Sequence, residues 1–184
     1  MRFTFSLLLI VFIAGLSACT ADEVTINQPP STELDGKYNW QSTVISKPVD
    51  LDLDGNSSTN FIAETHLRED TMHVYFLWLE TIEHSIEDRK FYDQRIFLWS
   101  PLSNLVSIEG KDLFTAYGLT NLLAKYKFSQ QTKTIDIIGN LGSGYVDSVR
   151  LINNTILEVK YRQYFYTSNG WEELSLTSAY MRAE

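Results

Sequence analysis

The chain has 184 residues, of which 44% are hydrophobic, and it carries 15 basic against 23 acidic side chains, a formal net charge of −8. That length fits one domain of ordinary size. A negative surface repels phosphate backbones, and the sequence offers no basic cluster with interleaved aromatic residues, so the composition argues against a nucleic-acid-binding protein.

The first 18 residues predict an export signal. Arg2 supplies a positive charge, residues 7–13 form an apolar run, and small residues then lead to a cysteine. The run is shorter than the ~20 residues that a transmembrane helix needs. Removal of the signal takes away one basic residue and leaves 14 against 23, a charge of −9.

Residues 16–19, Leu-Ser-Ala-Cys, resemble the lipobox of bacterial lipoproteins. The resemblance implies cleavage before Cys19, a covalent diacylglycerol on its thiol with palmitate as a further acyl chain, and a membrane anchor. In that family an aspartate after the cysteine favours the inner membrane, so Thr20 implies the outer membrane. Asp22 and Glu23 resemble the acidic tags of surface-exported lipoproteins, which leaves a periplasmic and a surface location open. The alternative is an ordinary signal peptide with an incidental cysteine.

Residues 19–34 contain two adjacent prolines and no periodicity, which is typical of a tether. The folded domain is expected over residues 35–184. There apolar and polar residues tend to alternate and β-branched and aromatic residues are frequent, which predicts strands. The clearest runs span 37–45, 72–80, 94–100, 133–139, 145–152, 154–166 and 171–182.

Turn signals separate the last of these strands. Asn169-Gly170 is a strong hairpin signal between the final two runs. The GNLGSG segment at 139–144 is a second turn, because it matches neither phosphate-binding glycine pattern and Ser143 lacks the neighbours of a nucleophile elbow. A short helix is expected around residues 60–66. About eight to ten strands with one short helix predict an all-β, antiparallel up-and-down barrel of about eight strands, with a β-sandwich as the alternative.

Three features together resemble small lipocalin-like lipoproteins of Gram-negative bacteria. They are Gly36-Lys37-Tyr38 in the first strand, the Asp-rich segment DLDLDGNSSTNFIAE, and the final hairpin that ends in SAYMR. Lipocalins place a tryptophan two residues after the first-strand glycine and pack a last-strand arginine against it. Tyr38 stands at the tryptophan position here, and the resemblance implies that Arg182 is the arginine. It also implies small-molecule binding.

Residues 50–58 resemble the start of a calcium loop. Asp50, Asp52 and Asp54 take positions 1, 3 and 5, and Gly55 takes position 6, followed by two further oxygen donors for a hard cation, Asn56 and Ser58. Position 12 does not fit, because Phe61 replaces the bidentate glutamate, and Glu64 comes three residues later; a differently placed helix would be needed to bring it in. The alternative is a strand whose Leu51 and Leu53 point inward while the aspartates face water.

The other polar clusters predict no site. The only three histidines are His66, His73 and His84, and they follow no zinc-binding spacing. Several aromatic residues would either line a cavity for an apolar ligand or fill the core. Both faces of the HVYFLWL run are apolar, so one of them needs a second layer, a partner or a ligand. The aromatic residues are Tyr75, Phe76, Trp78, Phe97, Trp99, Tyr161 and Phe165.

The sequence thus favours a non-enzymatic, lipid-anchored outer-membrane lipoprotein that binds a small apolar molecule or assists another envelope protein. The rival hypothesis is a calcium-stabilised adhesion or scaffolding β module without a small-molecule ligand, for which an exposed row of aromatic residues would speak. A hydrolase would require two carboxylates, or a serine and a histidine, that converge in one cleft.

Overall fold

The computed structural model describes residues 29–142 and 144–184. The predicted signal, Cys19, most of the tether and Ser143 lie outside the described residues. The elements in chain order are β1 (Gly36–Val49), β2 (Ser58–Asn60), α1 (Phe61–Thr65), the 3₁₀ helix η1 (Glu69–Val74), β3 (Phe76–Ile86), β4 (Arg89–Ile108), β5 (Lys111–Ser129), β6 (Thr134–Asn140), β7 (Tyr145–Asn153), β8 (Ile156–Thr167) and β9 (Gly170–Arg182). The prediction of an all-β fold with one short α-helix is confirmed.

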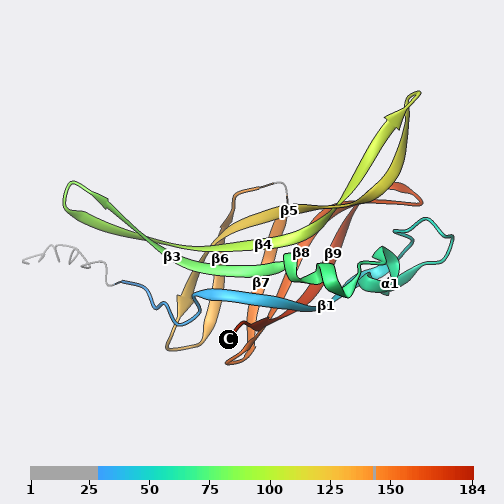
Figure 1. Ribbon diagram of the computed structural model, residues 1–184. Helices are drawn as coiled ribbons and strands as arrows, with labels where there is room; N and C mark the ends of the chain where they lie inside the picture. The colour runs from blue at the N-terminus through green and yellow to red at the C-terminus, as the bar shows by residue number, and fades with distance from the viewer. Residues whose placement is uncertain (1–28, 143) are drawn as a thin grey trace, which may run out of the picture.

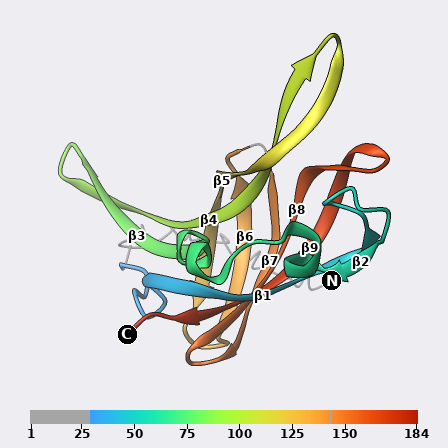
Figure 2. The same cartoon turned by 45° about the vertical axis from the view of Figure 1, so that its right-hand side comes forward.

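The strands form one antiparallel sheet in the order β6-β5-β4-β3-β1-β9-β8-β7, with β2 paired to β1. Apart from β2, strands that follow one another in the chain are neighbours, as in an up-and-down meander, except at β6 and β7. The first strand also pairs with the last, over a ladder that runs from Tyr38 opposite Arg182 to Ile45 opposite Leu176. The meander therefore curls round on itself (Figures 1 and 2).

The curled sheet lacks backbone pairing at one place among the described residues, between its end strands β6 and β7. Leu141, just after β6, still donates its N–H to the Leu123 carbonyl of β5 at 2.7 Å, so the chain stays with β5 before it turns. The Asn140 side chain joins the two strands there, accepting from the Val146 N–H at 2.7 Å and donating to its carbonyl at 3.2 Å. The strand order matches the predicted barrel, but the hydrogen-bonded sheet is not closed.

The inner face of the sheet is filled by side chains. In β8 the inward residues are Leu157, Val159, Tyr161 and Phe165, whereas Glu158, Lys160 and Arg162 are more exposed, as the alternation predicts. A side chain with no accessible area cannot line a cavity that admits water, and several inner positions are in this class. They include Leu77, Leu79, Ile96, Leu98, Leu157, Val159 and Phe165, all 0% exposed.

The predicted turn at Asn169-Gly170 is present. The strands β8 and β9 form a hairpin in which Thr167 pairs with Gly170, and Gly170 has a φ of +95°, which favours glycine. The segment predicted as the second turn, residues 139–144, begins at the end of β6 and includes Ser143, which lies outside the described residues. The pairing implied by the lipocalin resemblance is also found, because the Arg182 guanidinium lies 5.7 Å from the centre of the Tyr38 ring.

The β4–β5 hairpin projects beyond the rest of the sheet (Figures 1 and 2). Its strands have 20 and 19 residues, but β3 pairs with β4 only from residue 89 to 98 and β6 pairs with β5 only from residue 124 onward. The base of the projecting part places Tyr117 next to the segment that follows β1. Among the described residues, no helix is long and apolar enough to cross a membrane.

Candidate metal centre

The chain bends sharply after β1, so the Asp-rich segment is a loop. Asp50 is 4% exposed and Leu51 is 0% exposed, so two successive side chains are buried, whereas Leu53 has a φ of +64° and is 41% exposed. The Asp50 carboxylate accepts from the Gly55 N–H at 3.1 Å, and this contact closes the loop. The alternative interpretation, a strand with both leucines inward and the aspartates in water, is therefore wrong.

Phe61 anchors the helix α1 in the core, so α1 is held beside this loop. Phe61 is 0% exposed and makes an edge contact with Phe165 of β8 at 5.6 Å between ring centres. The Asn60 side chain caps the helix by accepting from the N–H groups of residues 62 and 63. Glu64, one turn after Phe61, then reaches the loop and accepts from the Leu51 N–H at 2.9 Å.

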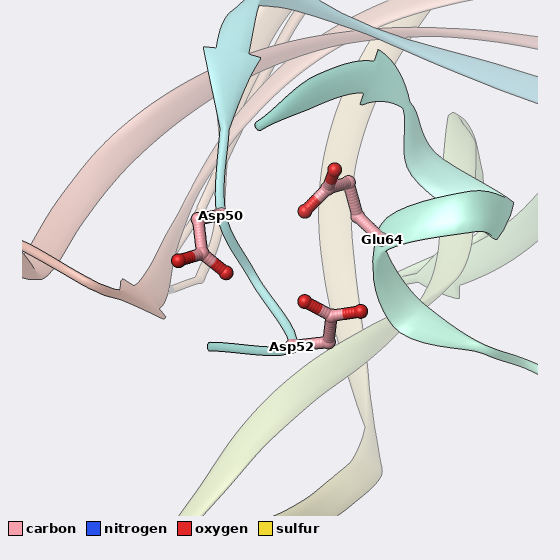
Figure 3. A group of neighbouring side chains, drawn as sticks. All are labelled: Asp50, Asp52 and Glu64. Atoms are coloured by element: carbon pink, nitrogen blue, oxygen red, sulfur yellow. The ribbon is translucent and has the colours of Figure 1, made fainter. Parts of the chain in front are cut away.

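Three carboxylates converge at this junction, those of Asp50, Asp52 and Glu64 (Figure 3). Each offers an oxygen, and these oxygens lie within 4.8 Å of one another. Two ligands of a calcium ion at 2.3–2.6 Å would be at most about 4.6–5.2 Å apart. The spacing therefore fits a shared cation. Among the residues that the structure describes, this is the one group of at least three His, Asp or Glu side chains arranged closely enough to hold a metal ion.

One oxygen in the group has no hydrogen-bond partner, although it is buried. It is Oδ1 of Asp50; the other oxygen, Oδ2, accepts from Gly55. A buried carboxylate oxygen without a donor loses its hydration and receives nothing in exchange, at a typical cost of about 1–3 kcal/mol or more. A cation bound there would supply the missing interaction.

The electrostatics of the loop point the same way. Burial raises the pKa of Glu64, and the nearby negative charges of Asp52 and Asp50 raise it further, while the hydrogen bond from Leu51 opposes the shift. The pKa of Tyr117 is also raised, first by burial and then by the carboxylates of Asp52, Glu64 and Asp50. Its hydroxyl donates to the Leu51 carbonyl at 3.0 Å. The site thus carries negative charge and is partly shielded from water, and both properties favour the binding of a divalent cation.

The structure divides the metal ligands expected from the sequence. Asp50 and Asp52 belong to the group, but Asp54 is exposed and accepts from the backbone and side-chain N–H groups of Asn56 at 2.7 and 3.1 Å. Ser58 accepts from the Asn60 N–H at 2.9 Å. The Asp54 N–H also donates to Oδ1 of Asp52 at 3.1 Å, so Asp54 lies beside the group although its carboxylate is not one of the three that converge. The roles expected for Asn56 and Ser58 stay predictions.

Two members of the site were not among the expected ligands, Glu64 and its neighbour His66. The sequence signal for Glu64 is its spacing of three residues from Phe61, which places it one helical turn beyond a core anchor. His66 ends α1 with a φ of +49°, and its Nε2 lies 2.6 Å from Oδ2 of Asp52. His84 instead contacts Asp93 at 3.5 Å, so these two histidines serve different carboxylates.

The aromatic residues singled out in the sequence divide between two faces. Tyr75, Tyr161 and Phe165 are buried in the core. The others lie on the outer face of β3 and β4 and are partly exposed, with the rings of Phe76 and Trp99 centred 5.6 Å apart and Lys37 lying over Phe76 at 4.6 Å. The outer residues are Phe76, Trp78, Phe97 and Trp99.

Comparison of the chain with protein-family models, with curated proteins and with solved structures gave no match.

Proposed function

We propose that this chain is a lipid-anchored, extracytoplasmic β module of the outer membrane that one calcium ion stabilises and that acts through its surface, as an adhesion or scaffolding unit or as an accessory to another envelope protein. The observation that carries the calcium ion is the buried, unpartnered Oδ1 of Asp50 beside two further carboxylates. All the ligands are oxygens, which suits a hard cation.

The position of the three carboxylates favours a structural role for the ion. Asp50 continues from β1, Glu64 comes from α1, and the Asp50 carbonyl accepts from the N–H of Ser168 in the β8–β9 turn at 3.1 Å. An ion held there links segments that are far apart in the sequence. These are the converging carboxylates that a hydrolase would require, but Asp50 and Glu64 are 4% and 5% exposed, which leaves little access for a substrate.

Action through the surface is supported by the two faces of the sheet. The inner face holds side chains with no accessible area, so an apolar ligand in the interior would have to displace packed residues. On the outer face, Trp78 is 40% exposed and lies among three other aromatic side chains. Exposed aromatic groups are enriched where proteins contact partners. We therefore favour surface contact over the small apolar ligand in the interior that the lipocalin resemblance implies.

The lipid anchor rests on Cys19 and its sequence context. Metabolic labelling with a palmitate analogue should mark the wild-type chain and leave a Cys19→Ser variant unlabelled, and the variant should leave the membrane fraction. Labelling of the variant would contradict the assignment of Cys19. A wild-type chain without label would contradict the anchor itself.

The calcium ion is tested by thermal unfolding of the purified protein in chelator and in 1 mM calcium. At a dissociation constant near 0.1 mM, within the range of extracellular modules, the ion would add about 1.4 kcal/mol and raise the unfolding midpoint by roughly 3–6 °C. Asp50→Asn should abolish the shift. Asp136→Asn, an exposed aspartate of β6, should retain it. No shift in the wild-type protein would contradict the proposal.

A further inference from the structure

A cavity of about 490 Å³ lies next to the three carboxylates. Its volume is in the range of small-molecule sites. One wall comes from the base of the β4–β5 hairpin, and the other comes from the end of α1 and the segment that leads through η1 to β3. Its lining includes Asp52, Thr65, His66, Tyr75, Phe114 and Tyr117.

Asp52 belongs both to the carboxylate group and to the cavity wall. Asp50 and Glu64 are closed in by protein, whereas the side chain of Asp52 is 15% exposed. Calcium takes six to eight oxygen ligands, and three carboxylates provide between three and six of them. The remaining positions of the ion are therefore expected on the Asp52 side, where the cavity lies.

The wall that comes from the β4–β5 hairpin is aromatic. The rings of Phe114 and Tyr117 are centred 4.9 Å apart, and Tyr75 lines the same cavity. Hydroxyl and imidazole groups lie on the side of α1, those of Thr65 and His66. A ligand that fits would thus present oxygen atoms to the ion and an apolar face to the rings.

The site with its ion would carry little net charge. A calcium ion with three ionised carboxylates leaves a net charge of −1, and Arg68, which also lines the cavity, offsets it. A neutral ligand that offers hydroxyl oxygens would complete the coordination of the ion without adding a charge. Vicinal hydroxyls on a ring with an apolar face are the pattern of a sugar.

We propose that this cavity binds a neutral sugar unit of a glycan, with two hydroxyls that complete the coordination of the calcium ion and a ring face that packs on Phe114. The inference rests on the proposed calcium ion. It names the class of surface ligand that the adhesion module would contact.

The test is calorimetric titration of the purified protein, in saturating calcium and in chelator, with methyl glucoside, methyl galactoside and methyl N-acetylglucosaminide. At least one of them should bind in calcium, and its affinity should fall at least tenfold in chelator. Phe114→Ala should weaken that binding about three- to tenfold, because an aromatic contact contributes about that much. Phe91→Ala, an exposed phenylalanine on the β3–β4 hairpin, is the matched control and should bind as the wild type does.

Binding that persists in chelator, or that Phe114→Ala leaves unchanged, would overturn the inference. Absence of binding by all three neutral sugars while calcium still raises the unfolding midpoint would also overturn it and leave the proposed function standing. Absence of the calcium shift would overturn both.

Discussion

The interior of the curled sheet and the loop after β1 are both buried, but burial has opposite effects on the stability of the two regions. Inside the sheet, apolar side chains such as Leu98, Val159 and Phe165 have no accessible area, and burial itself stabilises them. In the loop, burial brings three carboxylates together and leaves one oxygen of Asp50 without a partner. Burial of these charged groups costs free energy, which another interaction has to offset.

The comparison predicts that one domain contains a region whose stability does not depend on calcium and a region whose stability does. Apolar burial does not respond to calcium or to protons near neutral pH. We expect the carboxylate group to respond to both, because either a cation or a proton would reduce its charge. The following changes separate the two regions, and they run from the largest expected effect to the smallest.

Phe165→Ala should produce the largest loss of stability. Phe165 is 0% exposed and packs against Phe61, so the truncation leaves a cavity and lowers the free energy of unfolding by about 3–5 kcal/mol. Chemical denaturation should show a large loss both in chelator and in calcium. Phe91→Ala, on the exposed hairpin, should cost under about 1 kcal/mol. Because Phe165 also supports Phe61 and thereby α1, Leu98→Ala, at a 0% exposed position of β4, repeats the test away from the loop. A cost for Leu98→Ala that disappears in calcium would contradict the separation of the regions.

The effect of Glu64→Gln on the free energy of unfolding should change sign when calcium is added. In chelator at neutral pH, the neutral amide removes a desolvated charge from beside Asp50 and Asp52, so we expect the variant to gain on the order of 1 kcal/mol. In calcium it loses a ligand, so the wild type should be the more stable protein. Denaturation curves in the two buffers measure both differences.

The difference in stability between the wild type and Glu64→Gln should also depend on pH, because the pKa of Glu64 is raised. A carboxyl group whose pKa is higher in the folded state contributes stability below its unfolded value of 4.5, and that contribution is lost as the pH rises through the folded pKa. In chelator, the advantage of Glu64→Gln should therefore be full at neutral pH and vanish near pH 4. An advantage that grows on acidification would contradict this assignment.

Asp54→Asn should have the smallest effect. The Asp54 carboxylate is exposed and accepts from Asn56, and it is not one of the three carboxylates that converge, although its spacing in the sequence matches a calcium ligand. The calcium shift should stay within about 2 °C of the wild-type value in thermal unfolding. Loss of the shift would mean that the ion follows the sequence pattern and not the arrangement in the structure.

The extent to which the site could be predicted depends on how local each contact is. Asp50 and Asp52 stand out in the sequence because they are two residues apart, and the helix that follows them was expected close to its position at residues 61–65. Glu64 could be named only on condition of a differently placed helix, because its approach to Asp50 depends on Phe61 packing against Phe165, which lies more than 100 residues later. Tyr117 joins the site from β5 for the same reason, through its hydrogen bond to the Leu51 carbonyl.

The sequence by itself determined the all-β class, most of the strands, the hairpin at Gly170 and the short helix, since these follow from side-chain alternation and local backbone preferences. Only the tertiary structure decided three other features. The sheet curls without pairing β6 to β7, because Leu141 stays bonded to β5. One aromatic set faces inward and the other outward, because each strand has two faces and both are apolar in β3. The carboxylates converge because packing of distant residues, and not their spacing along the chain, places α1 beside the loop.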